Sequence, residues 1–158
     1  MKIKTLLCSG FAAVCTVMAV QVVIAYWQLN LIDKAVDNIV RASRNESMSR
    51  EIAERVNGMR RYELGALVTA DERDQQLERA TKAGKENTQL AEELEKYQRN
   101  PETRQIAANM RTLNERYVRS HEQAVAFGKE GSLDAMRDLI QGEARKAQRE
   151  LAAESEKF

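Results

Sequence analysis

The sequence predicts an all-α protein in which an N-terminal transmembrane helix continues into an antiparallel up-down-up-down four-helix bundle. The segment Leu6–Trp27 holds no charged residue, whereas Asp, Glu, Lys and Arg make up 31% of the whole chain. Proline occurs once and aromatic residues make up only 5%, so the turn-forming and strand-forming residues of a sheet protein are scarce. Beyond Trp27, apolar residues recur at three- and four-residue spacing, which is the period of a helix with one buried face.

The N-terminal apolar segment is long enough to cross the hydrocarbon core of a bilayer as a helix. Lys2 and Lys4 precede it, and basic residues beside a span favour the cytoplasmic side. Tyr26 and Trp27 close it, as aromatic residues do at a membrane interface. The expected organisation is a cytoplasmic N-terminus over residues 1–5, a membrane span over 6–27, and a helical bundle on the far side of the membrane over 28–158.

Three other interpretations of this segment are less favoured. A cleaved signal peptide would use a site near Val17-Met18-Ala19, but the apolar run continues past it for longer than a signal peptide needs. Lipid attachment at Cys8 or Cys15 would want a small residue immediately before the cysteine, and larger aliphatic residues stand there. A buried helix of a soluble protein would need apolar surroundings, and nothing downstream is apolar enough to supply them.

The first bundle helix is expected to be one continuous helix from about Lys4 to Thr69, because neither proline nor a loop cluster interrupts it. Its contact face changes near Arg44–Met48, where one apolar stripe gives way to another. The membrane-proximal stripe, expected to face a partner, is Ile32, Val36, Ile39 and Ser43. The distal stripe, expected to face the bundle core, is Met48, Ile52, Val56, Met59 and Ala66.

Three breaks divide the rest of the chain. Ala70–Asp74 is polar, Asn100-Pro101 places a proline near the first turn of a new helix, and Gly128–Ser132 ends one helix and offers Ser132 as the N-cap of the next. The predicted bundle helices therefore cover about 28–69, 74–98, 101–127 and 132–157. Short connections of this kind make successive helices antiparallel neighbours.

Each of the last three helices has an apolar stripe. The second helix has Leu77, Ala80, Gly84, Ala91, Leu94 and Tyr97; the third has Ile106, Met110, Leu113, Tyr117, Ala124 and Phe127. The fourth has Leu133, Met136, Ile140, Ala144, Ala147, Leu151 and Phe158.

Little in the sequence supports chemistry, so we expect no enzymatic activity, cofactor or metal site. His121 is the single histidine and has no second histidine or nearby cysteine, which favours a packed or surface side chain over a metal ligand. Glycine-rich phosphate loops and nucleophile elbows are missing from the sequence. The formal net charge of +1 argues against a nucleic-acid partner. The carboxylates, including those of Glu86, Glu92–Glu95 and Glu150–Glu156, alternate with Lys and Arg as solvated helix faces do.

The arginines of the first helix are the exception. Glu63 falls within the apolar face, which is costly unless the carboxylate is paired, and Arg60 lies three residues away as an expected partner. In an antiparallel bundle this level faces the start of the fourth helix, and arginines there could hold a small anion bidentately. Ordinary ion pairing between helices is the alternative. The candidate ligand-binding residues are Arg55, Arg60, Tyr62, Arg137 and Gln141.

Three stretches resemble bacterial methyl-accepting chemotaxis receptors that have a four-helix-bundle sensor domain. They are the Met1–Lys4 start directly before a span, Val56–Arg61 in the first helix, and Gly131–Arg145 in the fourth. The resemblance implies a periplasmic sensor that binds small molecules, often organic acids or amino acids, at a homodimer interface. It also implies ligand contacts by arginines of the first helix, for which Arg55 and Arg60 are the positional matches.

Such receptors also carry a second span, a HAMP linker and a cytoplasmic signalling coiled coil. The sequence has none of these, so we expect either a receptor fragment that stops before its second span or a stand-alone product. Two other hypotheses remain open at this point. One is a membrane-tethered helical bundle that binds a protein partner, and the other is the sensor region of a histidine kinase or a cyclic-nucleotide enzyme.

Overall fold

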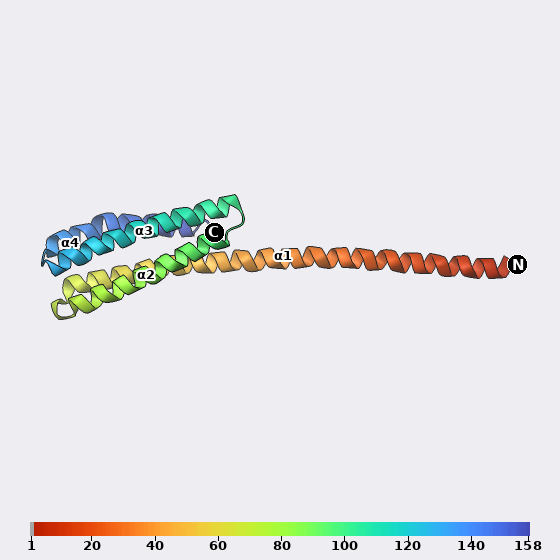
Figure 1. Ribbon diagram of the computed structural model, residues 1–158, viewed down its shortest axis with the longest axis horizontal. Coiled ribbons are helices and arrows are strands. Elements are labelled where there is room, and N and C mark those ends of the chain that lie inside the picture. Colours follow the sequence, from red (N-terminus) through yellow and green to blue (C-terminus); the bar gives the residue numbers. More distant parts are fainter. Residues whose placement is uncertain (1) are drawn as a thin grey trace. The chain divides into compact units, whose positions relative to one another are not determined.

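The computed structural model describes the backbone of residues 2–158 and the side chains of residue 3 and residues 10–158. Every regular element in that range is helical, which confirms the all-α prediction (Figure 1). The elements are α1 (Lys2–Val68), the 3₁₀ turn η1 (Ala70–Glu72), α2 (Arg73–Tyr97), α3 (Pro101–Lys129), α4 (Leu133–Leu139), the π-helical η2 (Ile140–Ala144) and α5 (Arg145–Ser155).

The chain divides into two units, Met1–Ala42 and Ser43–Phe158. The first unit consists of the N-terminal part of α1. That helix is long and apolar enough to cross a membrane, with a mean hydropathy of 1.8 in its most apolar stretch and no part of that stretch buried. The membrane-proximal residues Ile32, Val36 and Ile39 are 51–68% exposed. Their expected contact with a partner therefore stays a prediction.

The second unit is a four-helix bundle. It comprises the end of α1, then α2, α3 and a fourth helix that α4, η2 and α5 form together. In this unit each helix runs antiparallel to the one before it (Figure 1), as the short connections predict. Near the C-terminus, the Ser49 hydroxyl lies 3.4 Å from the carbonyl oxygen of Ser155, so α5 ends beside the start of the bundle part of α1.

Local signals set the helix ends. The Asn100 side chain accepts a 2.9 Å hydrogen bond from the Glu102 amide, and Pro101 occupies the first turn of α3 where no amide donor is needed. Gly131 has φ +76° and terminates α3 in the left-handed conformation that glycine adopts without strain. The Ser132 amide donates to the Phe127 carbonyl at 2.9 Å, which completes a Schellman-type end.

The bundle core has two apolar clusters. The first holds Met48, Ile52, Val56, Met59, Ala80, Ala91, Leu94, Ala107, Met110, Tyr117, Ala144, Ala147 and Leu151. The second holds Ala66, Leu77, Ala124, Met136 and Ile140. The distal stripe of the first helix is entirely buried, as predicted. These two sets are called the first and second clusters below.

Tyr97 is an exception to the predicted stripe of the second helix, since it is 49% exposed. The Arg44 guanidinium carbon lies 4.1 Å from the centre of its ring, a cation–π distance. Tyr97 is the last residue of α2 and its ring stays at the surface, whereas the next residue, Gln98, is buried.

The fourth helix is not uniformly α-helical, because Ile140–Ala144 forms a π turn. Its first residue, Ile140, belongs to the second cluster and its last, Ala144, to the first cluster. The wide turn therefore lies at the level where the core passes from one cluster to the other. Single π turns inside α-helices occur frequently at functional sites.

Glu154 is a second exception, because the sequence places it on a solvated face and it is only 8% exposed. The Asn109 side chain donates to its carboxylate at 2.9 Å, and Lys157 donates to the other oxygen at 2.5 Å. Burial opposes ionisation of this group, but the hydrogen bonds from Lys157 and Asn109 outweigh it and lower the pKa of Glu154. Its charge is thus held by contacts that form only on folding.

This lowered pKa predicts a loss of stability in acid. The unfolded chain takes up the Glu154 proton first, so the contribution is complete above about pH 5 and is lost as the pH falls through the folded-state pKa. Urea midpoints of wild type and Glu154→Gln should differ at pH 7 and converge as the pH falls. Glu130→Gln, at an exposed position without a described side-chain contact, should track wild type at every pH. A constant difference between wild type and Glu154→Gln would contradict this prediction.

Candidate functional site

A buried polar layer separates the two apolar clusters. Glu63 is completely buried in α1, between Met59 of the first cluster and Ala66 of the second. Tyr117 and His121, both on α3, are also buried. The Tyr117 hydroxyl donates to one Glu63 carboxylate oxygen at 2.8 Å, and His121 Nδ1 lies 2.9 Å from the other. Both oxygens of the buried carboxylate are therefore partnered, which offsets the cost of removing it from water.

Thr81 on α2 completes this layer. Its hydroxyl oxygen lies 2.9 Å from His121 Nε2, on the side of the ring opposite Glu63, and also 2.8 Å from the Leu77 carbonyl. We call Glu63, Thr81, Tyr117 and His121 the buried polar layer. It connects three helices through one continuous set of hydrogen bonds.

The layer admits two donor arrangements, because the Thr81 hydroxyl has a single proton. When that proton goes to the Leu77 carbonyl, the Thr81 oxygen can accept a hydrogen bond from His121 Nε2. When the hydroxyl turns toward Nε2, that ring nitrogen is the acceptor instead. The orientation of one hydroxyl is thus coupled to the donor and acceptor roles of a buried ring.

Tyr117 acts as a fixed donor in this layer. Burial, followed by the negative charge of Glu63, raises the pKa of Tyr117 far above its ordinary value. The phenol therefore keeps its proton throughout the physiological range, and its hydrogen bond to Glu63 points in one direction only.

The expected pairing of Arg60 with Glu63 is wrong. Arg60 Nη1 instead donates to the Gln148 side-chain oxygen on α5 at 2.9 Å, and the Gln148 amide donates to Asn57. Glu63 points into the bundle, where α3 supplies its partners, while Arg60 lies toward α5 and is only half-buried. Residues three apart on a helix differ by about 60° in direction, which is enough to give them different neighbours.

Arg55 makes a different contact from Arg60. It donates to Glu51 within α1 and to Glu86 on α2, both at 2.8 Å. The hydrogen bonds that Arg55 donates to Glu51 and then to Glu86 raise the pKa of Arg55. Its guanidinium is therefore already occupied by two carboxylates.

The other three predicted ligand residues lie apart from this contact. Tyr62 is half-buried against the first cluster. Arg137 pairs with Asp134 in its own turn at 2.8 Å, and Gln141 is exposed on η2. The described contacts do not join the five predicted residues into one constellation. A shared ligand site for them stays a prediction.

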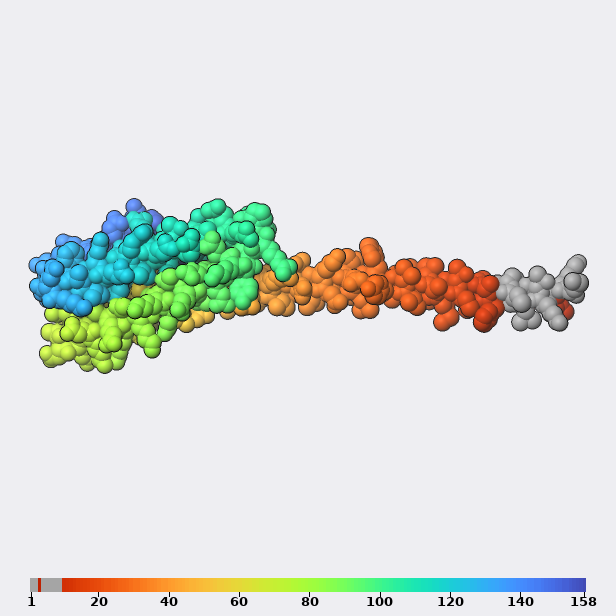
Figure 2. Space-filling model, viewed as in Figure 1, coloured from red at the N-terminus to blue at the C-terminus, as the bar shows by residue number. Residues whose placement is uncertain are grey.

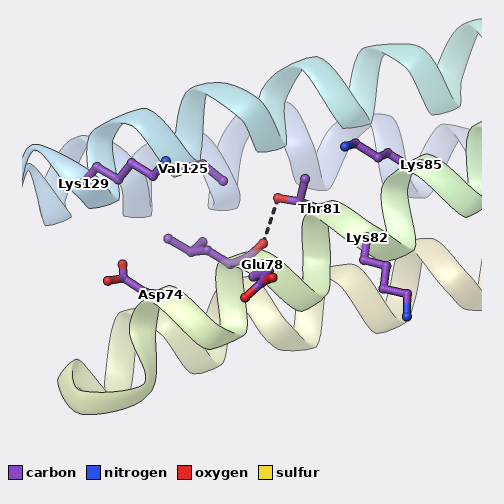
Figure 3. Close-up of a pocket in the computed structure, with 8 residues that line it drawn as sticks. Asp74, Glu78, Thr81, Lys82, Lys85, Val125 and Lys129 are labelled. Carbon is purple, nitrogen blue, oxygen red and sulfur yellow. Dashed lines mark hydrogen bonds between the residues drawn. The ribbon is translucent and has the colours of Figure 1, made fainter.

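A groove lies between α2 and α3, beside the buried polar layer. It has a volume of about 760 Å³, and its lining residues are Asp74, Leu77, Glu78, Thr81, Lys82, Lys85, Val125 and Lys129 (Figure 3). Thr81 belongs both to this lining and to the buried polar layer. No local pattern in the sequence predicts this groove, because it depends on how α2 and α3 align with each other.

The fold and this geometry can be compared with known proteins. A family model described as a four helix bundle sensory module for signal transduction matches residues 1–158. The chain belongs to this family. The match covers the whole sequence and confirms the resemblance to the sensor part of methyl-accepting chemotaxis receptors. Comparison with curated proteins and with solved structures gave no match.

Because the chain belongs to a sensory family, the hydrogen bonds of the buried polar layer matter for how its helices are held together. A sensor module must respond to binding with a change in the relation between its helices, and such a change is a shift between states of different stability. The layer ties α1 to α2 and α3 by directional hydrogen bonds, whereas the apolar clusters on either side are not directional. The sequence indicated Glu63 as an unusual residue, but nothing in it identified Tyr117 or Thr81 as partners.

Proposed function

We propose that the chain is the periplasmic small-molecule sensor of a chemotaxis-type transmembrane receptor, and that its ligand is a carboxylate or an amino acid. The observation that carries this proposal is Arg60. Its guanidinium is half-buried, and no carboxylate among the described residues lies within ion-pair distance of it. A partly desolvated cation with a neutral partner is an attractive position for an anionic ligand.

The other well-placed arginines of the bundle contrast with Arg60. Arg55, Arg111 and Arg116 each contact two glutamates, so their charges are already compensated. Arg60 donates one described hydrogen bond, to Gln148. The other N–H groups of its planar guanidinium remain available to bind a carboxylate bidentately. The half-buried amides of Asn57 and Gln148 lie beside it and supply further donors and acceptors.

The proposed response follows from where Arg60 lies. A ligand held there contacts α1 and α5 together, so its binding energy favours one displacement of these helices over another. The same α1 contains the apolar segment that we propose spans the inner membrane, with the amino end in the cytoplasm. We propose that the receptor acts as a homodimer through α1, where the membrane-proximal stripe is exposed.

The test is a thermal-shift screen of the full chain in lipid nanodiscs against small carboxylates and amino acids. A ligand that binds the folded state at about a hundredfold above its Kd adds about 2.7 kcal/mol of stability and raises the melting temperature. Arg60→Ala should remove the shift. Arg61→Ala removes the same charge from an exposed neighbouring position and should retain it.

Two outcomes would contradict the proposal. The first is a ligand shift that survives Arg60→Ala, since the binding site would then lie elsewhere. The second is no shift with any compound together with a tight protein partner in pull-downs. That result would favour the membrane-tethered interaction bundle.

A further inference from the structure

The groove between α2 and α3 has the features of a second ligand site, separate from Arg60. We propose that it binds a small carboxylate with an apolar body, such as an aromatic or branched monocarboxylate. Small-molecule sites are typically concave and largely apolar, with a few polar groups that fix the orientation of the ligand. The groove combines an apolar base, a hydroxyl and lysine amines in this way.

The apolar base consists of Leu77 from α2 and Val125 from α3. Leu77 is only 2% exposed and packs in the second cluster. Its Cδ1 lies 3.0 Å from where a Cβ on Gly128 would stand, so α3 approaches it closely and fixes its position. The base is therefore formed before any ligand arrives, which lowers the cost of binding.

The charged groups of the groove select an anion. Lys85 and Lys129 extend their amines over the groove from opposite ends, whereas the amine of Lys82 points away (Figure 3). Among the described residues, neither Lys85 nor Lys129 has a carboxylate within ion-pair distance. Two carboxylates also line the groove, Asp74 at one end and Glu78 between Asp74 and Lys82 on α2 (Figure 3), so three lysines stand against two acidic residues. A carboxylate between these amines gains charge contacts that the protein does not itself provide.

Thr81 connects the groove to the interior. Its hydroxyl lines the groove and also contacts His121 Nε2 at 2.9 Å. The Thr81 hydroxyl donates to the Leu77 carbonyl at 2.8 Å, and a ligand carboxylate that takes this proton instead leaves the Thr81 oxygen as an acceptor toward His121 Nε2. Occupation of the groove is thereby coupled to the buried polar layer through one side chain.

The proposal is tested with benzoate as the probe, on the full chain in nanodiscs. Benzoate should raise the melting temperature in a saturable way, and benzamide, its neutral counterpart, should have little effect. Lys85→Ala and Lys129→Ala should each weaken the apparent Kd by up to about fivefold, as expected for an exposed charge contact, and the double variant by more. Lys96→Ala, at an exposed α2 position outside the groove, is the matched control.

A second variant separates loss of binding from loss of folding. Val125→Glu places a carboxylate at the half-buried base of the groove and should abolish the benzoate shift while the circular dichroism spectrum stays helical. Arg60→Ala should leave benzoate binding unchanged, which distinguishes this site from the proposed Arg60 site. The proposal is overturned if benzoate gives no saturable shift, if benzamide matches it, or if the double lysine variant keeps the wild-type Kd.

Discussion

Replacing His121 with leucine is expected to lower the free energy of unfolding by about 3–5 kcal/mol, because it removes one partner of a completely buried carboxyl group. His121 and Glu63 are 1% and 0% exposed, so water cannot replace the lost hydrogen bond. The substitution leaves the Glu63 carboxylate with Tyr117 as its remaining described partner. Urea unfolding of the full chain in detergent, followed by circular dichroism, measures the change.

The control removes three of the four residues of the buried polar layer at once and leaves Thr81, which keeps its hydrogen bond to the Leu77 carbonyl. A triple variant with Glu63→Leu, Tyr117→Phe and His121→Leu leaves no buried carboxylate, and apolar replacement of a buried pair is often neutral or stabilising. It should therefore be more stable than the single His121→Leu variant. If the free energy of unfolding of the His121→Leu variant lies within about 1 kcal/mol of the wild-type value, His121 is not an important partner of the buried Glu63 carboxyl group.

The second large effect concerns the closest approach of α2 to its neighbours. Gly84→Leu should destabilise the bundle by about 1–3 kcal/mol or more, because extra atoms in a packed core force other side chains to shift. A Cβ at Gly84 would already lie 2.9 Å from Met59 Cε and 3.5 Å from Val118 Cγ2. Leucine adds three further carbons in the same space. The free energy of unfolding in urea is again the measurement.

Gly58 supplies the matched control. It lies inside α1, and a Cβ there meets nothing within 4 Å. Gly58→Ala should therefore stabilise the bundle by about 0.5–1 kcal/mol through the higher helix propensity of alanine. Equal losses for Gly84→Leu and Gly58→Ala would mean that close packing at Gly84 is not the cause.

Much of the fold follows from local patterns in the sequence. The stripe from Met48 to Ala66 is buried because apolar residues recur at helical spacing, and a bundle must cover that face. Asn100-Pro101 begins α3 and Gly131 ends it through their own side-chain and backbone geometry, so they can be recognised without a tertiary structure. No comparable local pattern in the sequence predicts the π turn at Ile140–Ala144.

The candidate site depends more on tertiary structure. Glu63 could be recognised as unusual, but its partners depend on the rotation of α3, and no local rule gives that rotation. Helical spacing predicts Arg60, three residues before Glu63, as the partner, although Arg60 contacts Gln148 on another helix. The groove could not be predicted from the sequence for the same reason. Lys85 and Lys129 are 44 positions apart in sequence, and only the alignment of α2 with α3 places them along one groove.

The buried polar layer also determines the helix alignment. Apolar layers in a bundle are nearly interchangeable, so a helix that slid by one turn, about 5.4 Å, would find similar surroundings. Glu63 would not, because such a slide would place its carboxylate against aliphatic side chains and cost far more than any packing gain. A buried polar pair thus fixes the register between the helices, as a buried polar residue does in a coiled coil. Any motion between α1 and α3 that keeps the bundle intact must remain smaller than the length of a hydrogen bond.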